Sequence, residues 1–114
     1  MVEKYRQIQD DLRVPAKTLR GLIPDIYSGF ADMHRHTMKD GSLDSKIKEL
    51  IALAISIVKR CDGCIVSHAK GAARNRATRE EVAEAIGVAI MMDGATATVY
   101  GPRAFEAYEE FSSN

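Results

Sequence analysis

The sequence predicts an all-α protein, a single-domain helical array of five to six helices. Three observations support this prediction: apolar residues recur at helical spacing along most of the chain, helix-capping signals separate the periodic segments, and no run shows the sustained apolar–polar alternation of a half-buried strand. The chain has 114 residues, of which 46% are hydrophobic and 28% are charged. One core is therefore expected over residues 1–114.

The first two predicted helices are amphipathic. The first covers residues 1–14 and is expected to stop before Pro15, because proline cannot donate a backbone hydrogen bond inside a helix. The second covers residues 25–39 and ends at the turn signal of residues 40–42.

The third predicted helix, residues 44–60, begins at an N-cap formed by Ser42 or Asp44. Its apolar residues fall on two strips nearly opposite each other, Ile47, Leu50, Ile51, Ala54, Ile55 and Val58 on one and Leu53 and Ile57 on the other. A helix that is apolar on most of its circumference packs in the middle of a fold.

Three more helical segments follow. The cysteine pair opens one that runs to about residue 75, and a capping box of Thr78 and Glu81 starts the next. The last helix begins after Gly94 and is expected to kink or restart at Pro102.

Charge and hydropathy exclude several classes of function. Sixteen basic and sixteen acidic side chains cancel, so we expect neither nucleic acid nor an anionic membrane as a partner. The longest stretch without a charge is about nine residues, whereas a membrane span needs about 20 apolar residues. The charged N-terminal segment lacks the apolar centre of a signal peptide, which predicts a cytoplasmic protein.

The two cysteines, Cys61 and Cys64, form a C-x-x-C motif, which in a cytosolic protein indicates redox chemistry or half of a metal site. On a helix that starts there, His68 follows Cys64 by one turn, and the small residues Gly71 and Ala72 share the same face. We expect this uncluttered face to let another helix approach closely.

Several neighbours favour the thiolate form of these cysteines. Cys61 lies at a helix N-terminus, and Lys59 and Arg60 add positive charge beside it. This position favours Cys61 as the reactive thiol, whereas proximity to His68 favours Cys64, and both assignments stay open.

Glu49 lies on the Leu53 and Ile57 strip of the third helix, so its carboxylate is expected to be partly buried. If this helix and the next form an antiparallel hairpin, Glu49 reaches His68 directly or through one water. A Glu–His–Cys relay would then be complete. His34 and His36 have no comparable context, and the sequence assigns them no role.

Residues 42–94 resemble the core of the carboxymuconolactone decarboxylase superfamily, most closely the alkylhydroperoxidase D branch. Glu49, Cys61 twelve residues later, Cys64, and His68 four residues beyond that fit the spacing of this branch without a gap. The resemblance implies an all-helical domain that assembles as a trimer or hexamer.

The resemblance also implies a thiol-dependent peroxidase or disulfide reductase that needs no bound cofactor. In that scheme a hydroperoxide oxidises Cys64 to a sulfenic acid, Cys61 resolves it to a disulfide, and His68 with Glu49 relays protons. The electron donor would be a thioredoxin-like or lipoyl-bearing protein.

Other interpretations of the motif remain. The cysteines could be an inert reduced pair, or Cys61, Cys64 and His68 could bind a metal with a fourth ligand, although no second C-x-x-C completes such a site. The superfamily name points to a cofactor-free decarboxylase or lactone-processing enzyme, which needs no thiols. A non-catalytic, redox-sensing oligomer is a third possibility.

Overall fold

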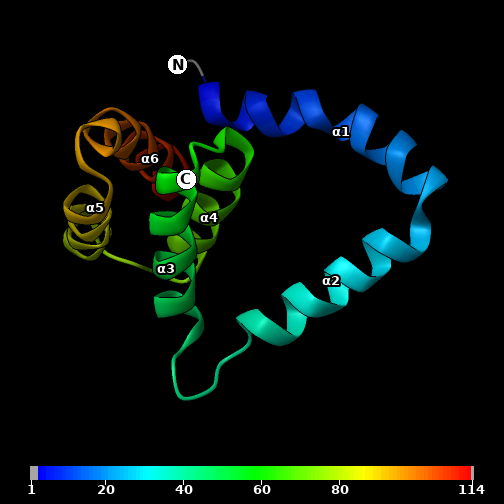
Figure 1. Cartoon of the computed structure of the whole chain (residues 1–114), viewed down its shortest axis with the longest axis horizontal. Coiled ribbons are helices and arrows are strands. Elements are labelled where there is room, and N and C mark those ends of the chain that lie inside the picture. Colours follow the sequence, from blue (N-terminus) through cyan, green and yellow to red (C-terminus); the bar gives the residue numbers. More distant parts are fainter. Residues whose placement is uncertain (1–2, 114) are drawn as a thin grey trace.

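The computed structural model describes residues 3–113, and every regular element in that range is a helix. In chain order these are α1 (Lys4–Leu22), α2 (Pro24–Met38), α3 (Ser45–Lys59), α4 (Asp62–Arg74), α5 (Arg79–Asp93), the short 3-10 helix η1 (Gly94–Thr96) and α6 (Ala97–Ser112) (Figure 1). The predicted all-α class is confirmed, and the cysteine motif opens a helix as expected.

The helices divide into a body and an arm. Helices α3 to α6 form the body, with α4 in contact with α1, α3 and α6. Helices α1 and α2 form the arm, a V that extends away from the body on one side (Figure 1). Helix α2 buries none of its side chains, so the arm adds little to the core of this chain.

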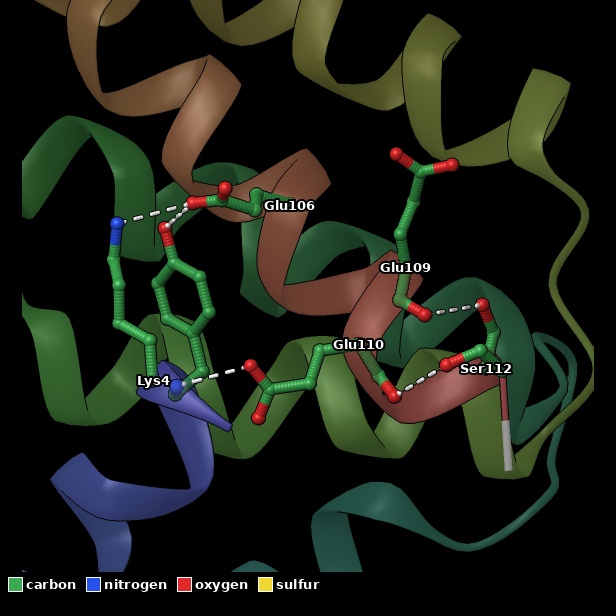
Figure 2. Close-up of a pocket in the computed structure, with 7 residues that line it drawn as sticks. Lys4, Glu106, Glu109, Glu110 and Ser112 are labelled. Atoms are coloured by element: carbon green, nitrogen blue, oxygen red, sulfur yellow. Dashed lines mark hydrogen bonds and ion pairs between the residues drawn. The ribbon is translucent and has the colours of Figure 1, made fainter. Parts of the chain in front are cut away.

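The start of α1 anchors the arm to the end of α6. Glu106 accepts hydrogen bonds from the Tyr5 hydroxyl at 2.6 Å and from Lys4 Nζ at 3.2 Å. Glu110 accepts a hydrogen bond from the backbone N–H of Tyr5 (Figure 2) and another from that of Arg6. Both bonds lie at the start of α1, where the first N–H groups point out of the helix. Tyr5 is the buried residue of α1.

The body buries only one of the two apolar strips of α3. Leu53 and Ile57 are fully buried between α4 and α5, as expected of a central helix. The opposite strip is only partly covered: Ile47, Ile51 and Ile55 are 41%, 46% and 52% exposed, whereas Leu50 and Ala54 pack against the core.

Two helix boundaries differ from the prediction, both at prolines. Helix α1 continues through Pro15 to Leu22, and α6 runs unbroken through Pro102. Both prolines are exposed, so the carbonyl that each leaves without a partner can bind water instead. The predicted N-cap at Asp44 and the capping box of Thr78 and Glu81 are both present.

One helical run, Arg79–Ser112, is long and apolar enough to cross a membrane by length and composition alone. Core helices of folded proteins pass the same test, so this is a weak indication. In the structure Gly94, at φ 81°, interrupts the run, and α5 packs against α6.

Candidate functional site

A tight turn between α3 and α4 builds the site. Arg60 takes the left-handed conformation at φ 54°, and the backbone N–H of Cys61 donates to the Ser56 carbonyl at 3.2 Å. This arrangement ends α3 and reverses the chain within one residue. Cys61 is then the N-cap of α4, and the two helices pack side by side.

Cys61 and Cys64 form a disulfide across the first turn of α4. The Cys61 sulfur also accepts a hydrogen bond from the Cys64 backbone N–H at 3.2 Å, in the place of the oxygen of an ordinary N-cap side chain. The unpaired N–H groups at a helix start favour negative charge. A reduced cysteine at such a position is in an environment that favours its thiolate form.

Glu49 of α3 and His68 of α4 form an acid–base pair. Glu49 Oε1 lies 2.7 Å from His68 Nδ1, and the two side chains are 8% and 19% exposed. Because an ionised carboxylate only accepts hydrogen bonds, Nδ1 is the donor when Glu49 is charged. Nε2 of His68 is then free to accept a proton.

Gly71 makes room for this pair. A Cβ atom at position 71 would overlap the carboxylate of Glu49. The small residue therefore allows the acid to cross from α3 to α4 and reach His68. This is the close approach that the small residues of the α4 face predict.

The disulfide and His68 lie on successive turns of α4. The disulfide caps the first turn, and His68 follows Cys64 by one turn on the same face. No hydrogen bond joins His68 to either sulfur within residues 3–113 in this disulfide form, and that range holds no group of three or more metal-ligating side chains. The catalytic roles of Cys61, Cys64, His68 and Glu49 stay predictions.

His34 of α2 also lies at the site, and sequence analysis assigned it no role. Its ring stacks on that of His68, with centroids 6.3 Å apart and planes inclined by 19°. No spacing within residues 25–39 indicates this contact, because it depends on how the loop before α3 folds α2 back.

Several hollows lie along α1. One of about 410 Å³ lies beside the cysteine turn and is lined by Gln9, Leu12, Arg13, Ala16, Gly63 and Lys70. Another of about 560 Å³ lies where Lys4 meets Glu106 and Glu110 of α6 (Figure 2), and no site residue lines it. The first hollow borders the C-x-x-C turn at Gly63.

Comparison with known proteins places the chain in a family. Residues 24–109 match the model of the carboxymuconolactone decarboxylase family. An uncharacterized protein of Cupriavidus necator is 36% identical over 90 residues, which cover 79% of this chain and 80% of that protein. An uncharacterized protein from the cox locus of Paracoccus denitrificans is 38% identical over 85 residues, or 75% and 77% of the two chains.

Solved structures give the same result. A carboxymuconolactone decarboxylase family protein of Legionella pneumophila, solved in its apo form, is 39% identical with a TM-score of 0.93 over 97% of this chain and 99% of its own. A family member from Thermotoga maritima, for which a role in the antioxidative response has been suggested, is 30% identical with a TM-score of 0.76 over 96% and 91%. This chain therefore belongs to the carboxymuconolactone decarboxylase family.

Proposed function

We propose that the protein is a thiol peroxidase of the alkylhydroperoxidase D type, which reduces hydroperoxides through the Cys61–Cys64 pair. The observation that carries this proposal is the disulfide at the start of α4 with the buried Glu49–His68 pair one turn beyond it. The family fold with this disulfide is compatible with redox activity. An acid–base pair beside two cysteines supplies the proton transfers that thiol oxidation requires.

The first half of the proposed cycle oxidises Cys64. His68 Nε2 takes the thiol proton, and the thiolate attacks the terminal oxygen of the hydroperoxide, the one that carries the hydrogen. The S–O bond forms while the O–O bond breaks, which leaves a sulfenic acid on Cys64 and an alkoxide. His68 returns the proton to the alkoxide, which departs as an alcohol. Glu49 stabilises the imidazolium between these two transfers.

The second half closes and reopens the disulfide. The Cys61 thiol attacks the sulfenic sulfur, the S–S bond forms, and hydroxide with the thiol proton leaves as water. The present structure corresponds in covalent form to this product. Two thiols of a donor protein then reduce the disulfide by thiol–disulfide exchange, supplying two electrons and two protons and becoming a disulfide themselves.

For the electron donor we propose a thioredoxin-like or lipoyl-bearing protein. Lys59 and Arg60 are exposed immediately before Cys61, and Arg13 and Lys70 line the hollow beside the turn. This basic surrounding favours a donor with an acidic face. We further propose a cytoplasmic location, where such donors keep thiols reduced.

A coupled assay tests the peroxidase. Reduced protein, a hydroperoxide and either thioredoxin or dihydrolipoamide should give sustained oxidation of the donor. Cys64→Ser should abolish turnover, and His68→Ala should lower it by about 10²- to 10⁴-fold. Unchanged turnover in Cys64→Ser would remove the hypothesis. Trapping the sulfenic acid in Cys61→Ser and Cys64→Ser separately decides which thiol meets the peroxide first.

Two other functions make different predictions. A cofactor-free decarboxylase or lactone-processing enzyme would use the Glu49–His68 pair alone, so its activity would survive the Cys61→Ser/Cys64→Ser double substitution. A redox-sensing oligomer would form the disulfide reversibly with peroxide but would not turn over repeatedly with donor. Mass spectrometry of the intact protein after graded peroxide treatment, with and without thioredoxin or dihydrolipoamide, separates a single disulfide-forming event from repeated turnover.

A further inference from the structure

His34 occupies an unusual place for a residue of the arm. The other described side chains of the candidate site come from α3 and α4, whereas His34 comes from α2, which buries no side chain of its own. Its ring lies 6.3 Å from that of His68 at an angle of 19°, and on its own helix it contacts Phe30 at 6.4 Å. Centroid distances of 4.5–7 Å are the range of energetically favourable ring pairs.

The connection between α2 and α3 fixes this placement. The Ser45 hydroxyl donates to the Met38 carbonyl at 2.8 Å, and Lys48 Nζ donates to the Lys39 carbonyl at 2.7 Å. Asp40 accepts from the Ser45 backbone N–H at 2.7 Å. These bonds tie the end of α2 to the first turn of α3, one turn before Glu49.

The ring of His34 restricts the orientation of the His68 ring in a way that the hydrogen bond to Glu49 does not. Its bond to Glu49 holds Nδ1 at 2.7 Å, but a hydrogen bond at one ring nitrogen tolerates a range of tilts of the ring plane about the Cβ–Cγ bond. A second ring that lies nearly parallel to the first restricts this rotation. The exposed fraction of the His68 side chain, 19%, shows that the body alone does not enclose it.

We propose that His34 is a positioning residue, which holds the imidazole of His68 in the plane where Nδ1 meets Glu49 and Nε2 stays available to the reacting groups. The effect of His34 on the reaction rate rests on the proposed thiol chemistry. Its effect on the orientation of the His68 ring does not. Stacking, rather than proton transfer by His34, is the operative feature. A phenylalanine at position 34 should therefore fulfil the same role as the histidine.

The test compares His34→Ala with His34→Phe, and uses His36→Ala as the matched control. His36 lies two residues further along α2, is exposed and makes no described ring contact. Because α2 buries no side chains, none of these changes removes a core contact. Two measurements are made: the rate at which peroxide consumes the thiols of the reduced protein, and the ¹⁵N NMR signals of the His68 ring, which report its tautomer.

His34→Ala should lower the rate of thiol oxidation about 2- to 10-fold, the range that ring contacts of this kind support. It should also weaken the preference for the Nδ1–H tautomer that the bond to Glu49 favours, giving a mixture of tautomers. His34→Phe and His36→Ala should stay within about twofold of the wild type in rate and keep its tautomer. Unchanged rate and tautomer in His34→Ala would overturn the proposal, as would a His34→Phe variant that is as impaired as His34→Ala.

The two measurements also separate this inference from the proposed function. If the wild-type protein consumes no peroxide, the peroxidase proposal fails, but the tautomer of His68 in His34→Ala still tests the positioning role. If peroxide is consumed and neither rate nor tautomer responds to His34→Ala, the positioning role alone fails.

Discussion

At the scale of single residues, the site depends on the missing side chain of Gly71 as well as on the side chains of Glu49 and His68. The carboxylate of Glu49 fills the space where a Cβ at position 71 would lie, and Gly71 itself is buried. A buried carboxylate needs a partner, because leaving it unpaired is costly. The glycine therefore decides whether Glu49 can reach His68.

Gly71→Ala tests this dependence. The methyl group should push Glu49 away from His68, lowering the free energy of unfolding by about 1–3 kcal/mol. Peroxide-dependent turnover should fall by at least about tenfold, because the acid–base pair is displaced. Urea unfolding and the coupled assay measure the two effects.

Gly87→Ala provides the control for this substitution. A Cβ at position 87 of α5 meets no atom within 4 Å, so alanine should raise the free energy of unfolding by up to about 1 kcal/mol through helix propensity. Its turnover should equal that of the wild type. Equal behaviour of the two variants would show that position 71 needs no glycine.

Sequence alone predicts most of the site residues because they lie on helices whose periodicity is readable. Cys61, Cys64 and His68 share one face of α4, and Glu49 lies on the buried strip of the neighbouring helix, so helical spacing plus one hairpin brings them together. His34 could not be predicted in this way. Its approach to His68 depends on hydrogen bonds in the loop before α3, which no periodicity encodes.

At the scale of helices, the prolines show the limit of local rules. A proline removes one backbone hydrogen bond, so the sequence predicts a helix end at Pro15 and a kink or restart at Pro102. Both helices continue, because the remaining bonds of a long helix and its packing outweigh one lost bond at an exposed position. Side-chain caps are more reliable signals, as the box of Thr78 and Glu81 shows.

The end of α4 stores strain that a substitution can remove. Arg76 takes φ 63°, with its N–H bonded to the Ala73 carbonyl and that of Ala77 bonded to the Ala72 carbonyl. Glycine is the usual residue in this conformation. Arg76→Gly should therefore raise the free energy of unfolding by about 0.5–1 kcal/mol, measured by urea unfolding.

Arg74→Gly is the contrasting change. It lies in the last turn of α4, so glycine there should lower the free energy of unfolding by about 1 kcal/mol. If both glycines destabilise the protein, the left-handed residue carries no relievable strain.

The attachment of α1 to α6 should depend on pH. Burial, and then the hydrogen bond to Glu106, raise the pKa of the Tyr5 phenol above its ordinary value. The hydrogen bonds from Tyr5 and Lys4 lower the pKa of the Glu106 carboxyl. The Tyr5 phenol, whose pKa is raised on folding, adds stability that is complete below about pH 10, the ordinary pKa of tyrosine. This stability is lost as the pH rises above that value. The Glu106 carboxyl, whose pKa is lowered on folding, adds stability that is complete above about pH 4.5 and is lost as the pH falls below it.

Tyr5→Phe tests the alkaline limb of this dependence. The variant should unfold about 1–2 kcal/mol more easily at pH 7, because Glu106 loses a donor. The difference from the wild type should shrink as the pH rises above about 10. Urea unfolding between pH 6 and pH 11 measures it. Tyr27→Phe, which removes a hydroxyl with no described hydrogen bond, should follow the wild type, and a gap for Tyr5→Phe that stays constant with pH would contradict the interpretation.

At the scale of the whole molecule, many large apolar side chains of the chain remain exposed. Its radius of gyration is 14.4 Å, compared with about 13 Å for a compact chain of this length, because the arm extends from the body. Exposed apolar side chains line three helices, Ile26, Phe30 and Met33 on α2, Ile47, Ile51 and Ile55 on α3, and Val88, Met91 and Met92 on α5. Exposed apolar side chains that gather into a patch mark protein interfaces, and Ile55 of α3 lies beside Val88 and Met92 of α5.

We therefore expect self-association, with a trimer or hexamer as the family resemblance implies. Light scattering coupled to size exclusion at micromolar concentration should give a multiple of 12.6 kDa. Ile51→Glu should shift the protein to smaller species, because it buries an unpaired charge in the interface. Ser67→Glu adds the same charge at an exposed position of α4 and should leave the assembly intact. A monomeric wild type would contradict the expectation, and an Ile51→Glu variant with unchanged mass would show that the exposed strip of α3 lies outside the interface.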